Sequence, residues 1–182
     1  MFNEAFVKEI MENSPEWMMS WKERLGFIAI IAAYRPKTVL EVGCWEGGHS
    51  RWLKKYCESL CCVDAFKPKP PVDCEFYFKK SDDAFAEFIA QGRKFDYIVI
   101  DADHSEDPSY RDLKNAIQIG KVITMHDSLN EGCRAGYKRA IEENWDKIAY
   151  AEFDFVTGQF IPAHEGVPGG NWGGVGLVIT KN

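Results

Sequence analysis

Two short stretches of the chain combine carboxylates with imidazoles. Asp101, Asp103 and His104 follow the apolar run YIVI, and His126 with Asp127 follows the run VITM. Continuous apolar runs are typical of buried parallel strands, and parallel strands end at the same edge of their sheet. The sequence therefore predicts that Asp101, His126 and Asp127 meet at one edge, where they could bind a divalent cation.

The same groups could also move a proton. His104 is a candidate general base, because an imidazole titrates near neutral pH, and the alternative is a histidine that only caps the nearby loop or helix. As a ligand, the imidazole of His126 would shift the preferred cation from Mg²⁺ toward Mn²⁺, Fe²⁺ or Zn²⁺. The sequence offers no clear third carboxylate, which is the weak point of the metal hypothesis.

A glycine-rich turn, EVGCWEGGHS (residues 41–50), follows an earlier apolar run. Glycine lets the backbone turn sharply and approach a ligand closely, and the helix that follows presents free amides. Asp64 lies 21 positions after Gly43, at the end of the next predicted strand, where a carboxylate can bind a ribose. Ser81 and Asp82 follow the third strand. Four successive strands thus end in polar groups, although a purely structural turn is the alternative for the glycines.

Strand and helix patterns alternate along most of the chain. The strands are predicted at about 38–43, 59–64, 74–80, 95–103, 121–128, 147–155 and 174–181, and the helices at about 14–34, 49–57, 81–91, 107–118 and 131–145. This alternation predicts an α/β fold, a single doubly wound Rossmann-like domain with a mostly parallel seven-stranded sheet and helices on both faces. The last two strands have no helix between them, so one of them should be antiparallel.

Residues 1–35 are predicted to form a helical cap before a nucleoside-binding core at 36–182. The first helix, with Ser14 as its capping residue, would bury one apolar stripe, made of Trp17, Trp21, Leu25 and Ile28. A lid over a substrate is the alternative for this stripe. His164 and Trp172 belong to a late Gly/Pro-rich loop, 156–172. His164 could contact a substrate, and Trp172 with its flanking glycines could belong to a lid or to a hairpin.

The amino-acid composition limits the classes of molecule that the protein is expected to bind. A net charge of -6 and a pI near 5.3 argue against nucleic acid or a membrane surface and favour a small molecule. None of the six cysteines forms a CxxC pair, and Cys61 and Cys62 are adjacent, so we expect reduced thiols. The sequence shows no secretory signal, which predicts a cytoplasmic protein. A homo-oligomer stays open.

The chain resembles the class I S-adenosylmethionine-dependent methyltransferases. The matching stretches, within residues 36–130, are EVGCWEGG, CVDAF, SDDAF, FDYIVIDADHS and KVITMHDS. More narrowly, the chain is similar to the small O-methyltransferases and cephalosporin-hydroxylase-like proteins, in which an IDGDH-type sequence ends the fourth strand. Two departures are Trp45 at the middle of the usual GxGxG pattern and a single Gly120 in place of Pro-Gly-Gly before the fifth strand.

The resemblance implies O-methylation of a small molecule, with S-adenosyl-L-methionine as the methyl donor and a divalent cation, Mg²⁺ or Mn²⁺, as a further cofactor. It implies metal ligation by Asp101 and Asp127, with His126 as a further candidate ligand. The implied donor-binding residues are Glu41, Gly43, Gly47, His49, Asp64, Ser81, Asp82 and Asp101. Asp101 and His104 are the catalytic candidates.

Three other functions stay open. A nicotinamide-dependent oxidoreductase uses the same sheet but normally has GxGxxG, which GCWEGG does not supply. A non-catalytic domain that binds the nucleoside or docks to a partner would have no need for the clustered histidines and aspartates. A metal-dependent hydrolase would use the groups at positions 101, 103, 104 and 127.

Overall fold

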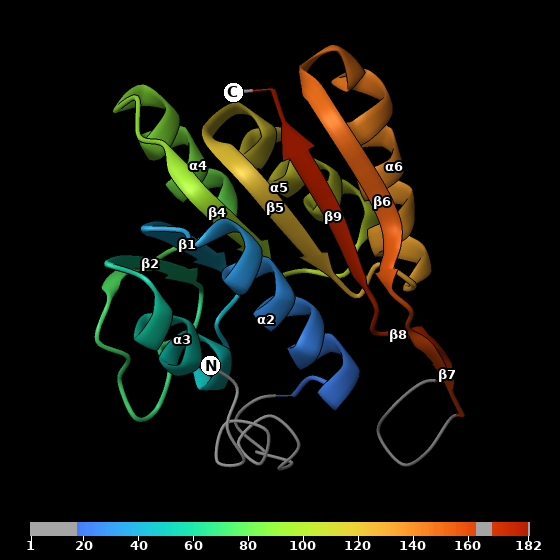
Figure 1. Ribbon diagram of the computed structural model, residues 1–182, viewed down its shortest axis with the longest axis horizontal. Helices are drawn as coiled ribbons and strands as arrows, with labels where there is room; N and C mark the ends of the chain where they lie inside the picture. Colours follow the sequence, from blue (N-terminus) through green and yellow to red (C-terminus); the bar gives the residue numbers. More distant parts are fainter. Residues whose placement is uncertain (1–17, 163–168, 182) are drawn as a thin grey trace.

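The computed structural model describes residues 18–162 and 169–181. Its centre is a seven-stranded sheet in the order β3-β2-β1-β4-β5-β9-β6 (Figure 1). The strands are β1 (Thr38–Val42), β2 (Ser59–Asp64), β3 (Glu75–Phe78), β4 (Phe95–Ile100), β5 (Gly120–His126), β6 (Ile148–Val156) and β9 (Val175–Thr180). The chain begins this sheet with β1 in the middle, adds β2 and β3 on one side of it, and then returns to add β4 and β5 on the other side. Ligands are expected at the carboxyl ends of β1 and β4, where the strand order changes side.

The strand directions confirm the predicted fold class. β1 to β5 pair in parallel, and β9 is antiparallel to both of its neighbours, β5 and β6. Strand β9 follows a hairpin rather than a helix, and an antiparallel neighbour needs no crossover connection. The expected antiparallel strand near the C-terminus is therefore β9.

Helices cover both faces of the sheet, with α2 and α3 on one face and α4, α5 and α6 on the other (Figure 1). The helices are α2 (Trp21–Tyr34), α3 (Gly48–Leu53), α4 (Ser81–Ala90), α5 (Glu106–Ile119) and α6 (Glu131–Glu143), with single 3₁₀ turns at η1 (Lys54–Tyr56) and η2 (Trp145–Lys147). Alternate strand residues enter the two cores: Leu40 and Ile98 pack toward α4 to α6, and Val39 and Tyr97 pack toward α2 and α3. Strand β4 is thus buried on both faces, as its apolar run predicts.

The N-terminal helix differs from the prediction. Residues 18–20 are not helical, and α2 begins at Trp21 with Ser20 as its cap. Ser20 has extended backbone angles (φ -64°, ψ 157°), which end any helix that approaches from the N-terminal side. The predicted continuous helix from Ser14 to Tyr34 is therefore wrong at these residues, and Ser14 and Trp17 lie outside the described residues.

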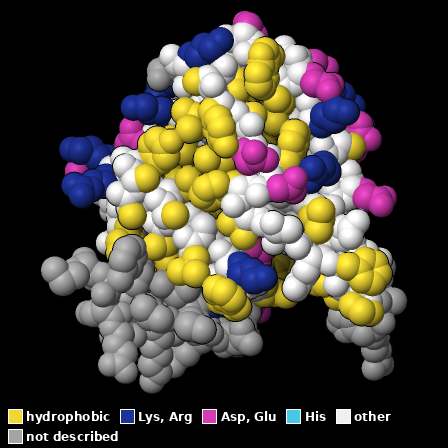
Figure 2. Space-filling view, turned by 45° about the vertical axis from the view of Figure 1, so that its right-hand side comes forward, with side chains coloured by type: hydrophobic (Ala, Val, Ile, Leu, Met, Phe, Trp, Pro, Cys, Tyr) yellow, Lys and Arg dark blue, Asp and Glu magenta, His cyan; other side chains and the backbone are white. Residues whose placement is uncertain are grey.

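The buried face of α2 also differs from the prediction. Trp21 and Leu25 are 47% and 44% exposed, whereas Phe27, Ile28 and Ile31 are buried. The helix sequence is apolar on nearly every side, so its periodicity alone does not select the buried face. Figure 2 shows hydrophobic side chains gathered on the face that carries α2, with charged side chains around them.

The loop predicted at 156–172 contains a small hairpin. Strands β7 (Gln159–Ile161) and β8 (Gly170–Trp172) pair as a separate two-stranded sheet. Strands of three residues leave too little alternation to detect in a sequence. His164 lies outside the described residues. All six cysteines are free thiols, and among the helices of the described residues none has the length and apolarity to cross a bilayer.

Candidate active site

A cavity of about 1150 Å³ opens at the carboxyl ends of β1, β2, β4 and β5. The start of α2, the first turn of α4 and the β7–β8 hairpin complete its walls. Nearly all the residues that the sequence singles out border it, namely Glu41, Gly43, His49, Asp64, Ser81, Asp82, Asp101, His104, His126 and Asp127. The parallel strands thus bring these groups to one rim, as their positions in the sequence predict.

The glycine turn is packed against the neighbouring strands. Gly43 has φ +88°, and its amide donates to Val63 O at 2.9 Å. A Cβ at Gly43 would lie 1.9 Å from Asp101 O, so no other residue fits there without a shift of backbone. Gly47, at φ +77°, is the N-terminal cap of α3 and lies under the side chains of Val72 and Pro68. It is the one predicted donor-binding residue absent from the cavity lining.

Asp64 holds this turn through backbone amides. Its Oδ2 accepts from Cys44 N at 2.6 Å and from Trp45 N at 2.9 Å, and its Oδ1 accepts from Phe66 N at 2.8 Å. A carboxylate has about four lone-pair sites, so these three amides leave it one further acceptor position. Asp64 can therefore orient the turn and still bind a hydroxyl group of a ligand in the cavity.

Glu41 is fixed below the turn by two residues of α3. Its carboxylate accepts from the Ser50 hydroxyl and lies 2.8 Å from His49 Nδ1. Both Glu41 and His49 are buried, and the His49 ring stacks on Trp52 with centroids 5.9 Å apart. His49 therefore supports Glu41 from within the protein, and it borders the cavity at the same time.

Ser81 and Asp82 occupy the first turn of α4. The capping position is Lys80, and Ser81 is the first helical residue. Arg111 Nε donates to both carboxylate oxygens of Asp82, at 3.1 and 2.9 Å, and all three residues border the cavity. Asp82 thus carries a cationic partner from α5 that the sequence did not indicate.

The ends of β4 and β5 build an acid–histidine network. His126 Nδ1 lies 3.0 Å from Asp101 Oδ1 and 3.1 Å from Asp127 Oδ2. The same Asp127 oxygen lies 2.7 Å from His104 Nε2, while Asp127 Oδ1 accepts from Gly173 N at 2.6 Å. Asp127 has φ +51°, a left-handed conformation that turns the chain at the end of β5. The predicted gathering of these four side chains is present.

A further carboxylate, Glu23 in the first turn of α2, completes the network. Its Oε1 lies 3.1 Å from His126 Nε2 and accepts from Gly174 N at 2.7 Å, and its Oε2 accepts from Ser20 N at 2.6 Å. Glu23 is a site residue that was not predicted from the sequence. The available signal was the capping box, a serine followed three residues later by glutamate, which marks the start of α2.

The charges in this network reinforce one another. Burial disfavours the imidazolium of His126, but the charges and hydrogen bonds of Asp101, Asp127 and Glu23 outweigh it and raise its pKa well above the ordinary value. Burial alone would raise the pKa of Asp127, yet its hydrogen bonds to the two histidines hold that pKa below its usual range. The hydrogen bond that the His104 ring donates to Asp127 also raises the pKa of His104. The network therefore favours the charged forms of His104, His126 and Asp127.

Asp101, His104 and Asp127 can hold a metal ion. Each offers one ligand atom, and the three atoms lie within 4.8 Å of one another. Both nitrogens of His126, in contrast, face carboxylates. The geometry thus favours His104 over His126 as the nitrogen ligand. Two carboxylate oxygens and one imidazole nitrogen form a donor set that suits Mn²⁺ better than Mg²⁺.

Aromatic side chains line the part of the cavity next to the network. Met18 and Trp21 border it and are 74% and 47% exposed. The prediction that Trp21 belongs to a buried helix stripe is therefore wrong. Trp172, on β8, meets the His104 ring edge-on with centroids 5.6 Å apart. The start of α2 and the hairpin therefore present apolar surface beside His104.

No family model matches this sequence, and no curated protein matches it. Solved structures do. An O-methyltransferase from Bacillus cereus in complex with S-adenosylhomocysteine (SAH) has a TM-score of 0.60 and 15% identity, over 98% of this chain and 92% of that one. The N-methyltransferase NodS from Bradyrhizobium japonicum WM9 in complex with SAH has a TM-score of 0.61 and 11% identity, over 97% of both chains.

A third similar structure is larger. The MycE methyltransferase from the mycinamycin biosynthetic pathway, in complex with Mg, SAH and mycinamycin VI, has a TM-score of 0.67 and 12% identity. The match covers 96% of this chain but 54% of MycE, so this chain spans about half of that protein. At such identities these likenesses establish a shared fold.

Proposed function

Because the chain has the fold of the class I S-adenosylmethionine-dependent methyltransferases, we propose that it transfers a methyl group from S-adenosyl-L-methionine to an oxygen atom of a small molecule. The observation that carries this proposal is the single cavity that joins the Asp64-bound glycine turn to the acid–histidine network. Three solved proteins that share this fold were crystallised in complex with SAH, which supports S-adenosyl-L-methionine as the donor.

The turn and its supports suit the donor. Gly43 would place the backbone beneath the methionine part, with Glu41 and His49 holding the turn from below. Gly47 would lead the turn into α3 outside the cavity lining. Asp64 would use its remaining acceptor position for a ribose hydroxyl group. Ser81 and Asp82 border the cavity beyond Asp64, where the adenine would lie. Positioning of this kind can supply about 7 to 11 kcal/mol of the barrier for a displacement.

His104 would accept the proton of the acceptor hydroxyl group. In the displacement, the bond from the methyl carbon to the sulfonium sulfur breaks as the bond to the acceptor oxygen forms, and the hydroxyl proton leaves. With Nε2–H of His104 donating to Asp127, the lone pair on Nδ1 can take that proton. Asp127 then stabilises the resulting imidazolium. Asp101, held by His126, lies beside the same part of the cavity.

A divalent cation is the second route to the same deprotonation. Asp101, His104 and Asp127 would hold it, and when bound it would lower the pKa of the acceptor hydroxyl group. Chelation then separates the two routes. If a cation is needed, EDTA abolishes turnover and Asp127→Ala removes the dependence on added Mg²⁺ or Mn²⁺. If His104 acts alone, EDTA leaves turnover unchanged.

Ligand-induced stabilisation tests the donor. We expect S-adenosylmethionine and SAH to raise the melting temperature, because a ligand that binds the native state stabilises it, whereas NAD should have no effect. A shift with NAD and none with either sulfur ligand would reverse the proposal in favour of an oxidoreductase. Methyl transfer itself is then measured with labelled donor and a panel of small hydroxylated acceptors. Tight SAH binding without transfer to any acceptor would favour a non-catalytic binding domain.

A further inference from the structure

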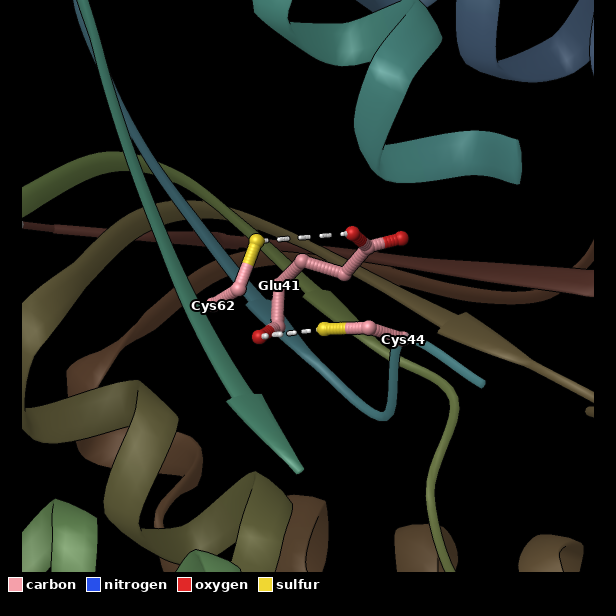
Figure 3. Close-up of side chains that lie close together, drawn as sticks. All are labelled: Glu41, Cys44 and Cys62. Atoms are coloured by element: carbon pink, nitrogen blue, oxygen red, sulfur yellow. Dashed lines mark hydrogen bonds between the residues drawn. The ribbon is translucent and has the colours of Figure 1, made fainter. Parts of the chain in front are cut away.

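A second group of potential metal ligands lies beneath the glycine turn. Glu41, Cys44 and Cys62, which we call the thiol–carboxylate cluster, lie close together at the ends of β1 and β2 (Figure 3). Cys62 Sγ is 3.9 Å from Glu41 Oε2, and Cys44 Sγ is 3.9 Å from the backbone oxygen of Glu41. All three side chains are buried, and no disulfide joins the two thiols.

The fold fixes this arrangement through strand pairing. Glu41 on β1 and Cys62 on β2 are direct partners in the parallel register, so their side chains leave the sheet on the same face. Cys44 follows three residues after Glu41, where the chain turns back at Gly43. Its thiol also lies 3.7 Å from Val63 O, which keeps the sulfur near the carboxylate.

The chemistry of the cluster differs from that of the acid–histidine network. Thiolates are soft ligands that select Zn²⁺, Cd²⁺ or Cu⁺ over Mg²⁺ and Mn²⁺. In a tetrahedral zinc site, with Zn–S bonds of about 2.3 Å, two sulfurs are roughly 3.8 Å apart. The three ligand atoms of the cluster already lie within 4.8 Å of one another, so each pair needs to close by about 1 Å at most.

Glu41 already has the surroundings of a metal ligand. Ligating carboxylates are normally hydrogen-bonded by an outer shell of side chains, and the hydroxyl of Ser50 and the ring of His49 hold Glu41 in this way. We propose that the thiol–carboxylate cluster is a binding site for a thiophilic divalent cation such as Zn²⁺ or Cd²⁺. Binding replaces the two thiol protons, which pass to solvent, by one cation held by two thiolates and one carboxylate.

The site has a functional consequence that rests on the proposed function. Glu41 and Cys44 border the cavity at the place assigned to the methionine part of the donor, whereas Cys62 lies one layer below. A cation bound there pulls Cys44, and with it the turn, toward Cys62. Thiophilic cations and the methyl donor therefore compete, and such cations inhibit methyl transfer even in an enzyme saturated with Mg²⁺.

Cadmium is the probe that tests the site, because a bond between Cd²⁺ and a thiolate gives an ultraviolet charge-transfer band that carboxylate and imidazole ligands do not give. We expect the full-length protein to bind one Cd²⁺ with this band in the presence of excess Mg²⁺. Cys62→Ser and Cys44→Ser should each weaken binding at least about tenfold, the lower end of what loss of an outer-shell partner costs. Cys61→Ser is the matched control, since Cys61 is equally buried on the same strand but faces the opposite core.

The outcomes separate this site from the proposed function. Absence of the band in the wild-type protein, or its full retention in both Cys44→Ser and Cys62→Ser, overturns the site. Circular dichroism and melting temperature verify folding, and Cys62→Ala replaces Cys62→Ser if the serine variant unfolds. If the protein gives the cadmium band but does not bind SAH, the metal site at the thiol–carboxylate cluster is supported and the proposed methyltransferase function is overturned. If Cd²⁺ does not weaken the binding of SAH, the inferred competition between thiophilic cations and the methyl donor is overturned.

Discussion

His126 Nε2 lies 3.1 Å from Oε1 of Glu23, although 103 residues separate the two in the chain. The same carboxylate accepts hydrogen bonds from the amides of Ser20 and Gly174. It therefore joins the start of α2 to the end of β5 and to the loop before β9. The helix that walls the cavity is tied by one buried ion pair to the residues proposed to do the chemistry.

Glu23→Gln should lower stability at neutral pH and change its dependence on acid. Burial alone would raise the pKa of Glu23, but the hydrogen bond and charge of His126 lower it from 4.5 to about 2. Glu23 thus contributes stability above pH 4.5 that is lost as the pH falls toward 2. At neutral pH the variant should lose on the order of 3 kcal/mol. Urea unfolding at a series of pH values measures this loss.

The acid limb provides the decisive comparison for Glu23. The difference in unfolding free energy between wild type and Glu23→Gln should shrink as the pH falls from 4.5 to 2. Glu58→Gln is the control, because Glu58 is 71% exposed and forms an ion pair with Lys37 at the surface. A difference that stays constant over this pH window would contradict the assigned charge pair.

The rate of methyl transfer should rise with pH as His104 loses its proton. The hydrogen bond from His104 to the Asp127 carboxylate raises the pKa of His104, so the midpoint of this rise should lie above 6.5, the ordinary value. His104→Gln should remove this limb and cut the rate by about 10² to 10⁴, the usual contribution of a general base. Asp127→Asn should move the midpoint downward. A midpoint that is unchanged in Asp127→Asn would exclude the assigned pairing.

The fold could be predicted because local pattern and global topology agree in this chain. The apolar runs that become β1, β4 and β5 are buried on both faces, and capping and glycine signals separate them from the helices. The start of α2 was not predicted, and the β7–β8 hairpin was one of two alternatives left open at Trp172. Strands of three residues carry little pattern, and the choice of the helix face depends on Val156 and Phe155, which pack against Gly26 from β6, far along the chain.

The candidate site was predictable where strand ends define it. Asp101, His126 and Asp127 share one edge because β4 and β5 are parallel neighbours, which the sequence pattern indicates. The partner of each side chain was not predictable, because it depends on ring orientation and on contacts from distant elements. The capping box of Ser20 and Glu23 marks the start of α2, but nothing in the local sequence shows that Oε1 of Glu23 meets His126.

Asp64→Asn should loosen the glycine turn and weaken SAH binding. Three backbone amides donate to the Asp64 carboxylate, and the amide group of an asparagine would present N–H to at least one of them. An unsatisfied donor costs about 1–3 kcal/mol, which corresponds to roughly a 5- to 150-fold loss of affinity if the cost falls on the bound state. Calorimetric titration with SAH measures it. Asp73→Asn, at a carboxylate that is 96% exposed, should leave the affinity unchanged.

Gly43→Ala should be far more costly than the same change at Gly92. Both glycines have positive φ, +88° and +66° respectively, so each alanine adopts a left-handed conformation, at roughly 1–2 kcal/mol. A Cβ at Gly92 meets nothing within 4 Å, whereas one at Gly43 would lie 1.9 Å from Asp101 O. Relief of that overlap must move the turn away from β4, which adds about 1–3 kcal/mol and displaces Asp101 from His126. Urea unfolding of both variants should therefore show a loss of about 2–5 kcal/mol for Gly43→Ala and about 1–2 kcal/mol for Gly92→Ala. Equal losses would show that the turn can separate from β4 without cost, and the close packing that brings the glycine turn to Asp101 would then not constrain the site.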